Sequence, residues 1–253
     1  MKIDLKGKLA VVTGASGELG RVTARTLAQC GADVAVHYFS NKDKADKVVA
    51  DVTKLGRKAK IFKADITDEK SVMGLRDAVA KQMGDPQIIV NNAVIQGPWV
   101  PVMEQPLENW ENQFKSCVLH NVYMAKAFLP AMIKKRWGRV ITINTECAMQ
   151  CAPGQSAYVA GKRGLDGVMR VLAKEVGEHQ ITVNQVAPGW MISDRARESG
   201  TEKQEGYEKS VPLKRRGEDQ DVANLVAFFA SDLSSFITGA YVSVSGGNVM
   251  PTI

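Results

Sequence analysis

The sequence is short of the residues on which several classes of protein depend. Its 253 residues include four cysteines and three histidines, and no two cysteines form a Cys-x-x-Cys pair. We therefore expect no metal site, and we interpret the cysteines as reduced thiols of a cytoplasmic protein. No window holds the ~18 apolar residues that span a bilayer, so no membrane segment is expected. The first residues likewise lack the apolar run of a signal peptide.

The charged residues are of both signs and are spread along the chain. Lys and Arg number 33 against 27 Asp and Glu, a net charge of +6, and the basic residues form only short clusters at 134–136 and 214–216. This pattern predicts no nucleic-acid partner, and it is compatible with an anionic ligand such as a dinucleotide or an acyl thioester. The composition, 45% hydrophobic and 24% charged, is ordinary for a globular protein.

Short apolar runs alternate with longer amphipathic segments along the chain. The runs are rich in Val, Ile and Ala, as strands covered on both faces are, and occupy residues 8–15, 33–38, 60–65, 88–93, 139–145, 181–187 and 240–245. Helical stretches occupy residues 19–29, 42–55, 68–83, 107–135, 156–177 and 219–230. The alternation predicts one α/β domain over residues 1–253, a Rossmann-like, doubly wound sheet of about seven parallel strands with helices on both faces. Residues 188–212 lack this pattern, and we expect them to form a substrate lid.

A glycine-rich turn follows the first predicted strand and precedes the first predicted helix. It reads Thr13-Gly-Ala-Ser-Gly-Glu-Leu-Gly20. Glycines at such a turn let the backbone approach a pyrophosphate, and the following helix offers free N–H groups and the positive end of its dipole. The turn therefore predicts a dinucleotide site. The residues expected to contact the dinucleotide here are Gly14, Ser16, Gly17, Glu18, Leu19 and Gly20.

The end of the second predicted strand should meet the adenosine ribose. It reads Val36-His-Tyr-Phe-Ser-Asn-Lys42 and contains no acidic residue to accept a hydrogen bond from a ribose 2′-OH. Ser40, Asn41 and Lys42 are suited to a 2′-phosphate, which favours NADP(H) over NAD(H). The alternative is that these residues only cap the next helix.

Tyr158 and Lys162 are four positions apart on a predicted helix, so their side chains share one face. A nearby ammonium favours a phenolate, and we expect it to lower the pKa of Tyr158 from about 10 toward neutrality. A tyrosine of that kind can give or take a proton. The alternative is a pair of neighbours on an amphipathic helix with no chemical role.

With these features the chain resembles the short-chain dehydrogenase/reductase family in its single-domain form, and in particular the 3-oxoacyl reductases. Further motifs carry the resemblance beside the glycine turn and the Tyr158/Lys162 pair. They are Asp65-Ile66, Asn91-Asn92-Ala93, Asn184-Gln-Val-Ala-Pro-Gly189 with Ser193 beyond it, and Val244-Ser-Gly-Gly247 in the tail.

The resemblance implies hydride transfer between a nicotinamide and a carbonyl or secondary alcohol. Tyr158 would exchange the proton, Lys162 would lower its pKa and hold the nicotinamide ribose, and Thr145 would polarise the carbonyl. Further cofactor contacts carried over from the family are Asp65, Ile66, Asn92, Ala93, Pro188, Gly189, Met191 and Ser193. The substrate pocket would include Ile95, Met149, Gln150 and Trp190. Family members are commonly homotetramers that pair their long helices.

The chain departs from the family pattern at three places that bear on function, of which one is Val94, where a glycine is usual after Asn91-Asn92-Ala93. Cys117 stands where the family has an asparagine that anchors a proton-relay water, so the relay is altered or Ser116 or His120 substitutes. Glu18 lies where a pyrophosphate would be repelled. A nucleotide-binding protein with little or no catalysis is therefore the alternative function. Within the oxidoreductase class, a 3-oxoacyl thioester with Arg136 meeting an acidic carrier protein and a sugar or polyol both stay open.

Overall fold

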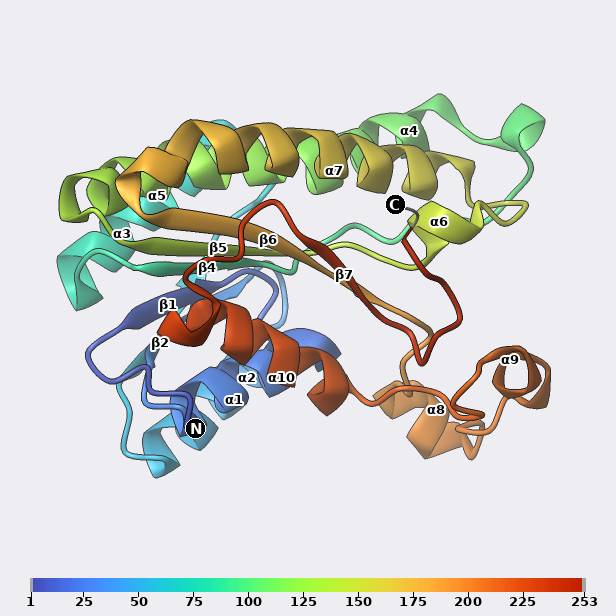
Figure 1. The fold of residues 1–253 in the computed structure, drawn as a ribbon, viewed down its shortest axis with the longest axis horizontal. Helices are drawn as coiled ribbons and strands as arrows, with labels where there is room; N and C mark the ends of the chain where they lie inside the picture. The colour runs from blue at the N-terminus through green and yellow to red at the C-terminus, as the bar shows by residue number, and fades with distance from the viewer. Residues whose placement is uncertain (1, 252–253) are drawn as a thin grey trace.

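A parallel sheet of seven strands forms the centre of the molecule, seen in a computed structural model that describes residues 2–251 (Figure 1). Its order is β3-β2-β1-β4-β5-β6-β7. The strands are β1 (Leu9–Val12), β2 (Asp33–Tyr38), β3 (Ala59–Lys63), β4 (Ile88–Asn91), β5 (Gly138–Ile143), β6 (Ile181–Pro188) and β7 (Tyr241–Val244). The expected α/β class with a parallel sheet of seven strands is confirmed.

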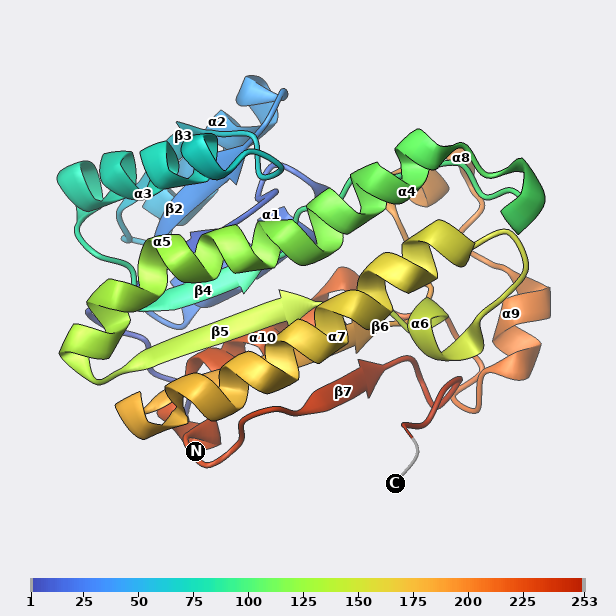
Figure 2. The same ribbon diagram turned by 90° about the horizontal axis from the view of Figure 1, so that it is seen from above.

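Helices cover both faces of the sheet. On one face lie α1 (Glu18–Gln29), α2 (Lys42–Lys54) and α10 (Asp219–Ala230), and on the other α3 (Glu69–Met83), α4 (Leu107–Phe114), α5 (His120–Lys135) and α7 (Ser156–Val176). Figure 2 shows α7 running beside α4 and α5 across the sheet. Three shorter helices, α6 (Cys147–Gln150), α8 (Asp194–Ser199) and α9 (Glu205–Ser210), follow the carboxyl ends of β5 and β6.

The strand residues divide their side chains between two cores. In β1, Ala10 and Val12 pack with the α1/α2/α10 layer, whereas Leu9 and Val11 pack with the α3/α5/α7 layer. Side chains of a strand alternate between its faces, so a strand covered on both sides must be apolar at every position. This explains why the strands read as unbroken apolar runs.

Three helices end where the sequence places a glycine. Gly31, Gly56 and Gly84 all have positive φ angles, of 106°, 74° and 97°. Glycine adopts that conformation without the steric penalty of a Cβ, so the chain can turn back toward the sheet.

The long helix expected over residues 107–135 is interrupted. A π-helical turn at Lys115–Leu119 separates α4 from α5, and Cys117 lies within it. A π-turn inserts one extra residue into the helical ladder, which bends the helix and is often found near functional sites. Elsewhere, no helix among residues 2–251 is long and apolar enough to cross a membrane.

Candidate active site

A cleft of about 1800 Å³, open to solvent, lies at the carboxyl ends of the strands. It brings together most residues that the sequence singled out: Gly14, Ser16, Gly17, Glu18, Leu19, Gly20, Ser40, Asp65, Ile66, Asn92, Ala93, Ile95, Thr145, Tyr158, Lys162, Pro188, Gly189 and Met191. Six others are not among the described residues that line this cleft: Asn41, Lys42, Met149, Gln150, Trp190 and Ser193.

The ends of β1 and β4 are clamped together at the floor of the cleft. The Thr13 hydroxyl accepts hydrogen bonds from the backbone N–H groups of Asn92 (2.9 Å) and Ala93 (3.1 Å). The Asn92 side chain in turn donates to the carbonyl oxygens of Thr13 (3.0 Å) and Gly14 (3.3 Å). The two strand ends therefore hold one position, although the connections that follow them lead to opposite faces of the sheet.

Close packing makes Gly20 necessary in this turn. A Cβ on Gly20 would lie 2.2 Å from the carbonyl oxygen of Gly14 and 2.9 Å from the Cα of Ala15. The first turn of α1 thus approaches the glycine loop more closely than any side chain at position 20 would allow, and its residues line the cleft.

His37 supports the same turn from below, and sequence reasoning missed it. Its Nδ1 accepts from the Gly14 N–H at 2.9 Å, so its Nε2 carries the proton and donates to the Ala64 carbonyl at 3.1 Å. Burial lowers the pKa of His37 to about 4, against the effect of the Ala64 carbonyl. A neutral imidazole is thus built into the glycine turn; a histidine at the end of a buried strand was the available signal.

Two carboxylates lie near the start of α1. Glu18 is the first residue of the helix and lines the cleft together with Asp219. Burial, with Glu18 as a second cause, raises the pKa of Asp219 to about 6. The helix dipole stabilises a carboxylate at this point, but the same carboxylate repels an anionic ligand.

The residues after β2 divide between the cleft and the next helix. Ser40 lines the cleft. Asn41 caps α2 by accepting from the Lys44 N–H at 2.9 Å, and Lys42 pairs with Asp46 at 2.6 Å. The alternative that these residues cap the next helix therefore holds for Asn41. The Lys42–Asp46 ion pair is exposed, and an exposed ion pair is a weak interaction.

Thr145, Tyr158 and Lys162 meet where β5 ends beside α7. The Lys162 Nζ lies 5.7 Å from the centre of the Tyr158 ring and donates to the Ile143 carbonyl at 2.7 Å. Burial raises the pKa of Tyr158 above its ordinary value, while the Thr145 hydroxyl acts in the opposite direction. Burial also lowers the pKa of Lys162. The expected fall in the pKa of Tyr158 is thus not found: desolvation is the largest cause and raises the pKa, and the Lys162 ammonium points at a backbone carbonyl.

Asn121 takes part in the contacts around Cys117, and sequence reasoning missed it. Its Nδ2 donates to the Cys117 carbonyl at 2.7 Å, and its Oδ1 accepts from Asn91 at 2.7 Å. His120 is buried, its Nδ1 donates to the Ser116 carbonyl at 3.3 Å, and burial lowers its pKa to about 3. Two side chains are therefore bonded to the backbone of the π-turn, His120 at the Ser116 carbonyl and Asn121 at the Cys117 carbonyl.

Glu146, next to Thr145, ties two distant segments to the end of β5. Its carboxylate accepts from the Tyr207 hydroxyl (3.0 Å) and from the Asn248 side chain (3.1 Å). The Tyr207 oxygen also accepts from the Trp190 N–H at 2.9 Å. Glu146 is 3% exposed, and burial raises its pKa. These contacts join residues 61 and 102 positions apart, so no local pattern could have predicted them.

A metal centre needs several His, Cys, Asp or Glu side chains close together. Among the residues that the structure describes, no three His, Cys, Asp or Glu side chains are grouped as metal ligands.

Known proteins are similar to this chain in both sequence and fold. A family model described as enoyl-(acyl carrier protein) reductase matches residues 14–248. The 3-oxoacyl-[acyl-carrier-protein] reductase FabG of Staphylococcus epidermidis is 35% identical over 243 residues, which are 96% of this chain and 99% of that protein.

Solved structures similar to this one include proteins with either nicotinamide cofactor. The promiscuous reductase LugOII, described as catalysing keto-reduction at C1 during lugdunomycin biosynthesis, is 33% identical with a TM-score of 0.90, over 97% of this chain and 99% of that one. A blue fluorescent protein from a metagenomic library, in complex with NADPH, is 32% identical with a TM-score of 0.89, over 98% and 100%. An NAD⁺-bound xylitol dehydrogenase is 28% identical with a TM-score of 0.89, over 96% and 99%.

The neutral state of His37 predicts a loss of stability in acid. The folded pKa is about 4, below the ordinary value of 6.5. The unfolded chain therefore takes up this proton first, and stability present above pH 6.5 is lost as pH falls toward 4. His37→Asn should reduce the slope of unfolding free energy against pH in this window by about one proton. Denaturant titrations at several pH values measure it. Above pH 7 the two proteins should differ by a constant, and an unchanged acid slope contradicts the assignment.

Loss of the Tyr207 hydroxyl should loosen the segment around α9. Tyr207→Phe leaves Glu146 without one donor and the Trp190 N–H without its acceptor. Backbone amides of residues 205–210 should then exchange with deuterium about tenfold faster or more. Amides of α7 in the same sample serve as the internal control. Unchanged exchange at α9 would show that the Glu146 contact does not hold this segment.

Proposed function

The chain belongs to the short-chain dehydrogenase/reductase family, and from that premise we propose that it is an NADP(H)-dependent carbonyl reductase or alcohol dehydrogenase with Tyr158 as its general acid and base. One observation carries the proposal. The cleft that is lined by the glycine turn of the first βα unit is also lined by Thr145, Tyr158 and Lys162. Nucleotide binding and proton transfer are thus available in the same space.

A bound nicotinamide would supply or accept the hydride, and the side chains of the cleft would handle the proton. Because burial raises its pKa, Tyr158 is protonated at neutral pH. An alkoxide formed by hydride transfer is far more basic than a phenolate, so a neutral phenol can donate to it. Thr145 is positioned beside the same phenol and can donate to the carbonyl oxygen. We assign Lys162 to the nicotinamide ribose.

We propose NADP(H) as the preferred cofactor. Ser40 faces the cleft, and the segment after β2 offers Lys42 and no carboxylate to a ribose hydroxyl. The exposed Lys42–Asp46 pair is a weak interaction, so Lys42 can exchange it for a 2′-phosphate.

The names of the relatives suggest two substrate classes, a 3-oxoacyl thioester as for FabG and a polyol as for xylitol dehydrogenase. The carrier-bound thioester requires a basic surface. Arg136, the residue considered for it, donates to the Glu178 carbonyl at 2.8 Å. We therefore favour a free small molecule that reaches Ile95 and the neighbourhood of Trp190.

We also propose that residues 188–212 form a substrate lid of a single domain. Arg216 supports this interpretation, since it donates to the carbonyl oxygens of Thr201 (3.3 Å) and Glu202 (3.0 Å) and lies over the Trp190 ring. These contacts connect the segment to the loop before α10, and the Tyr207–Glu146 contact is one of its attachments near Thr145.

A homotetramer in the cytoplasm is the proposed form and location. An apolar groove of about 1250 Å³ runs between α5 and α7, with Leu129, Ile133, Val168 and Val171 among its lining residues. Val171 is 56% exposed. A large apolar patch of this kind is typical of a surface that pairs with a second copy.

Replacement of Tyr158 tests the mechanism. Tyr158→Phe should lower kcat/KM for a reducible ketone by about 10²–10⁴-fold and leave the Kd for NADPH within about twofold, because only the proton donor is lost. Steady-state kinetics and calorimetric titration measure the two quantities. Tyr123→Phe on α5 is the matched control and should behave as the wild type. Full activity of Tyr158→Phe contradicts the mechanism, and tight NADPH binding without turnover of a broad ketone panel favours the non-catalytic alternative.

Replacement of Lys42 tests the cofactor preference. The wild type should bind NADPH more tightly than NADH, and Lys42→Ala should narrow this ratio by about three- to tenfold, since an exposed ion pair contributes about 1 kcal/mol. Titration calorimetry measures both Kd values, and the preference should weaken as salt is raised. Lys44→Ala is the matched control. Equal binding of the two cofactors by the wild type rules out the proposed preference.

A further inference from the structure

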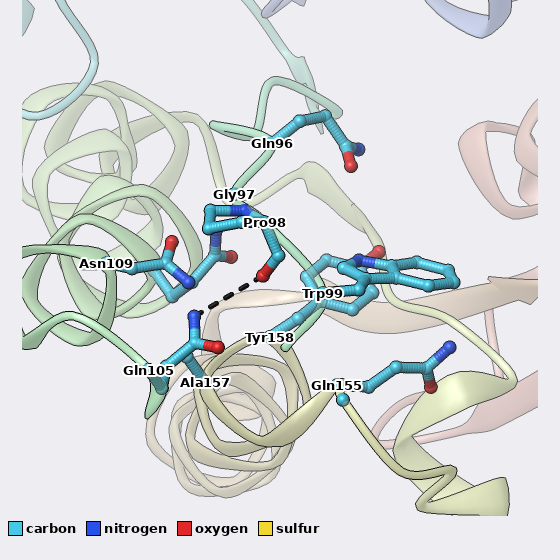
Figure 3. A pocket seen from close by; sticks show the side chains of 11 residues that line it. Gln96, Gly97, Pro98, Trp99, Gln105, Asn109, Gln155, Ala157 and Tyr158 are labelled. Atoms are coloured by element: carbon cyan, nitrogen blue, oxygen red, sulfur yellow. Dashed lines mark hydrogen bonds between the residues drawn. The ribbon is translucent and has the colours of Figure 1, made fainter. Parts of the chain in front are cut away.

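A second, narrow recess opens beside Tyr158 and has room for about one water-sized group (Figure 3). Its walls come from the loop after β4, from α4 and from the start of α7. Five of its lining side chains are amides, those of Gln96, Gln105, Asn109, Gln113 and Gln155. The indole of Trp99, which is 59% exposed, lies beside Tyr158 in the same view.

Two of these amides have buried oxygen atoms without a partner. Gln105 is 8% exposed and Gln155 is 7% exposed, and within residues 2–251 neither Oε1 has a hydrogen-bond partner. Gln105 uses its Nε2 to donate to the Pro98 carbonyl at 3.4 Å. Buried polar atoms in folded proteins are nearly always paired. Each of these two acceptors is therefore open to a donor, whether that donor is a water molecule or a ligand group.

Packing around the recess holds other amides in place. A Cβ on Gly97 would lie 1.9 Å from the Asn109 Oδ1, so the loop after β4 rests directly against that side chain. Gln113 donates to the Ile95 carbonyl at 2.7 Å and accepts from the Cys117 Sγ at 3.8 Å. Both the nitrogen and the oxygen of the Gln113 amide are thus bonded within the protein. The unpaired oxygens of Gln105 and Gln155 are the ones that can meet a ligand.

The recess carries no formal charge. The lining residues other than the amides are Gly97, Pro98, Trp99, Gly154, Ala157 and Tyr158, so none of the described lining residues is acidic or basic. A carboxylate, phosphate or ammonium would lose its hydration there without an opposite charge to replace it. A hydroxyl both donates and accepts, so it matches an amide turned either way.

The recess and the cofactor cleft adjoin each other at Tyr158. Both Tyr158 and Gln96 line the two cavities. A substrate carbonyl held at Tyr158 can therefore place a neighbouring small group in the recess while its carbon chain lies against Trp99.

We propose that the recess is a binding subsite for an uncharged hydroxyl, carried one or two carbons from the reacting carbonyl, with the amide oxygen of Gln105 or of Gln155 as the acceptor of its single O–H. Hydroxyketones, and the diols they form on reduction, are the substrate class that this subsite selects. The proposal rests on the oxidoreductase function proposed above. Gln105 and Gln155 are specificity residues in it, and Tyr158 keeps its role in proton transfer.

The wild-type enzyme tests the subsite with carbonyl compounds matched in their carbon skeleton. Butan-2-one is compared with 3-hydroxybutan-2-one and 4-hydroxybutan-2-one, and 3-oxobutanoate serves as the charged member, each with NADPH and with NADH. The kcat/KM for at least one hydroxyketone should exceed that for butan-2-one by about tenfold or more, because a site built for a hydroxyl discriminates against the analogue that lacks it. The 3-oxobutanoate value should be the lowest.

Two substitutions assign the preference to the recess. Gln105→Met and Gln155→Met keep an unbranched side chain of similar length and remove the amide. At least one of them should lower the ratio of hydroxyketone to ketone kcat/KM by about three- to tenfold, because the single O–H donates to one of the two amide oxygens. Gln82→Met, on α3 away from the cleft, is the matched control and should keep the wild-type ratio. If a variant does not fold, the wild-type series still decides.

The outcomes separate this subsite from the function on which it rests. Equal kcat/KM values for butan-2-one and both hydroxyketones overturn the subsite and leave the oxidoreductase intact. A preference for hydroxyketones that survives both substitutions overturns the assignment to Gln105 and Gln155. Absence of turnover with every carbonyl, in protein that binds the cofactor, overturns the proposed function and the subsite together.

Discussion

The contact between Thr13 and Asn92 is the constraint on which the cleft depends. It joins the ends of β1 and β4, the two central strands from which the sheet extends in opposite directions. At such a switch point the following connections diverge to opposite faces, and a crevice opens between them. The clamp fixes the separation of the glycine turn and the loop after β4. His37 then supports the turn from the second strand, so three neighbouring strands set the position of one short loop.

The wall opposite the turn depends on how closely α7 approaches the π-turn. A Cβ on Gly161 would lie 3.0 Å from the Gln113 carbonyl and 3.2 Å from the Cys117 Cβ, so the helix that carries Tyr158 rests on the segment that carries Cys117. The small thiol fits this contact and donates to the Gln113 Oε1 at 3.8 Å, while Asn121 donates to the Cys117 backbone carbonyl at 2.7 Å. Gln113 therefore connects Cys117 to the amide-lined recess, because it accepts from the thiol and also lines the recess.

Local sequence patterns predicted the fold and predicted that most of the candidate residues would line one cleft. They did not predict properties that depend on side chains distant in the sequence. Apolar runs, glycine stops and the βαβ alternation are short-range signals, and they located all seven strands and the Tyr158/Lys162 face. The predicted direction of the Tyr158 pKa shift was wrong because desolvation depends on the whole surrounding structure. The roles of Asn41 and Lys42 in capping and pairing depend on rotamers that the sequence does not specify. Glu146 and His37 went unnoticed because their partners lie far along the chain.

The central claim is that the cleft carries a hydride between a nicotinamide and a carbonyl carbon. Transfer of deuterium from the cofactor tests it most directly. NADPH labelled at C4, in each of its two stereochemical forms, is incubated with the enzyme and 3-hydroxybutan-2-one, and the product is analysed by mass spectrometry and NMR. We expect a diol with deuterium on the newly formed carbinol carbon from one form of the label only. Unlabelled diol from both forms, or bound cofactor that is never oxidised by any carbonyl, would contradict it.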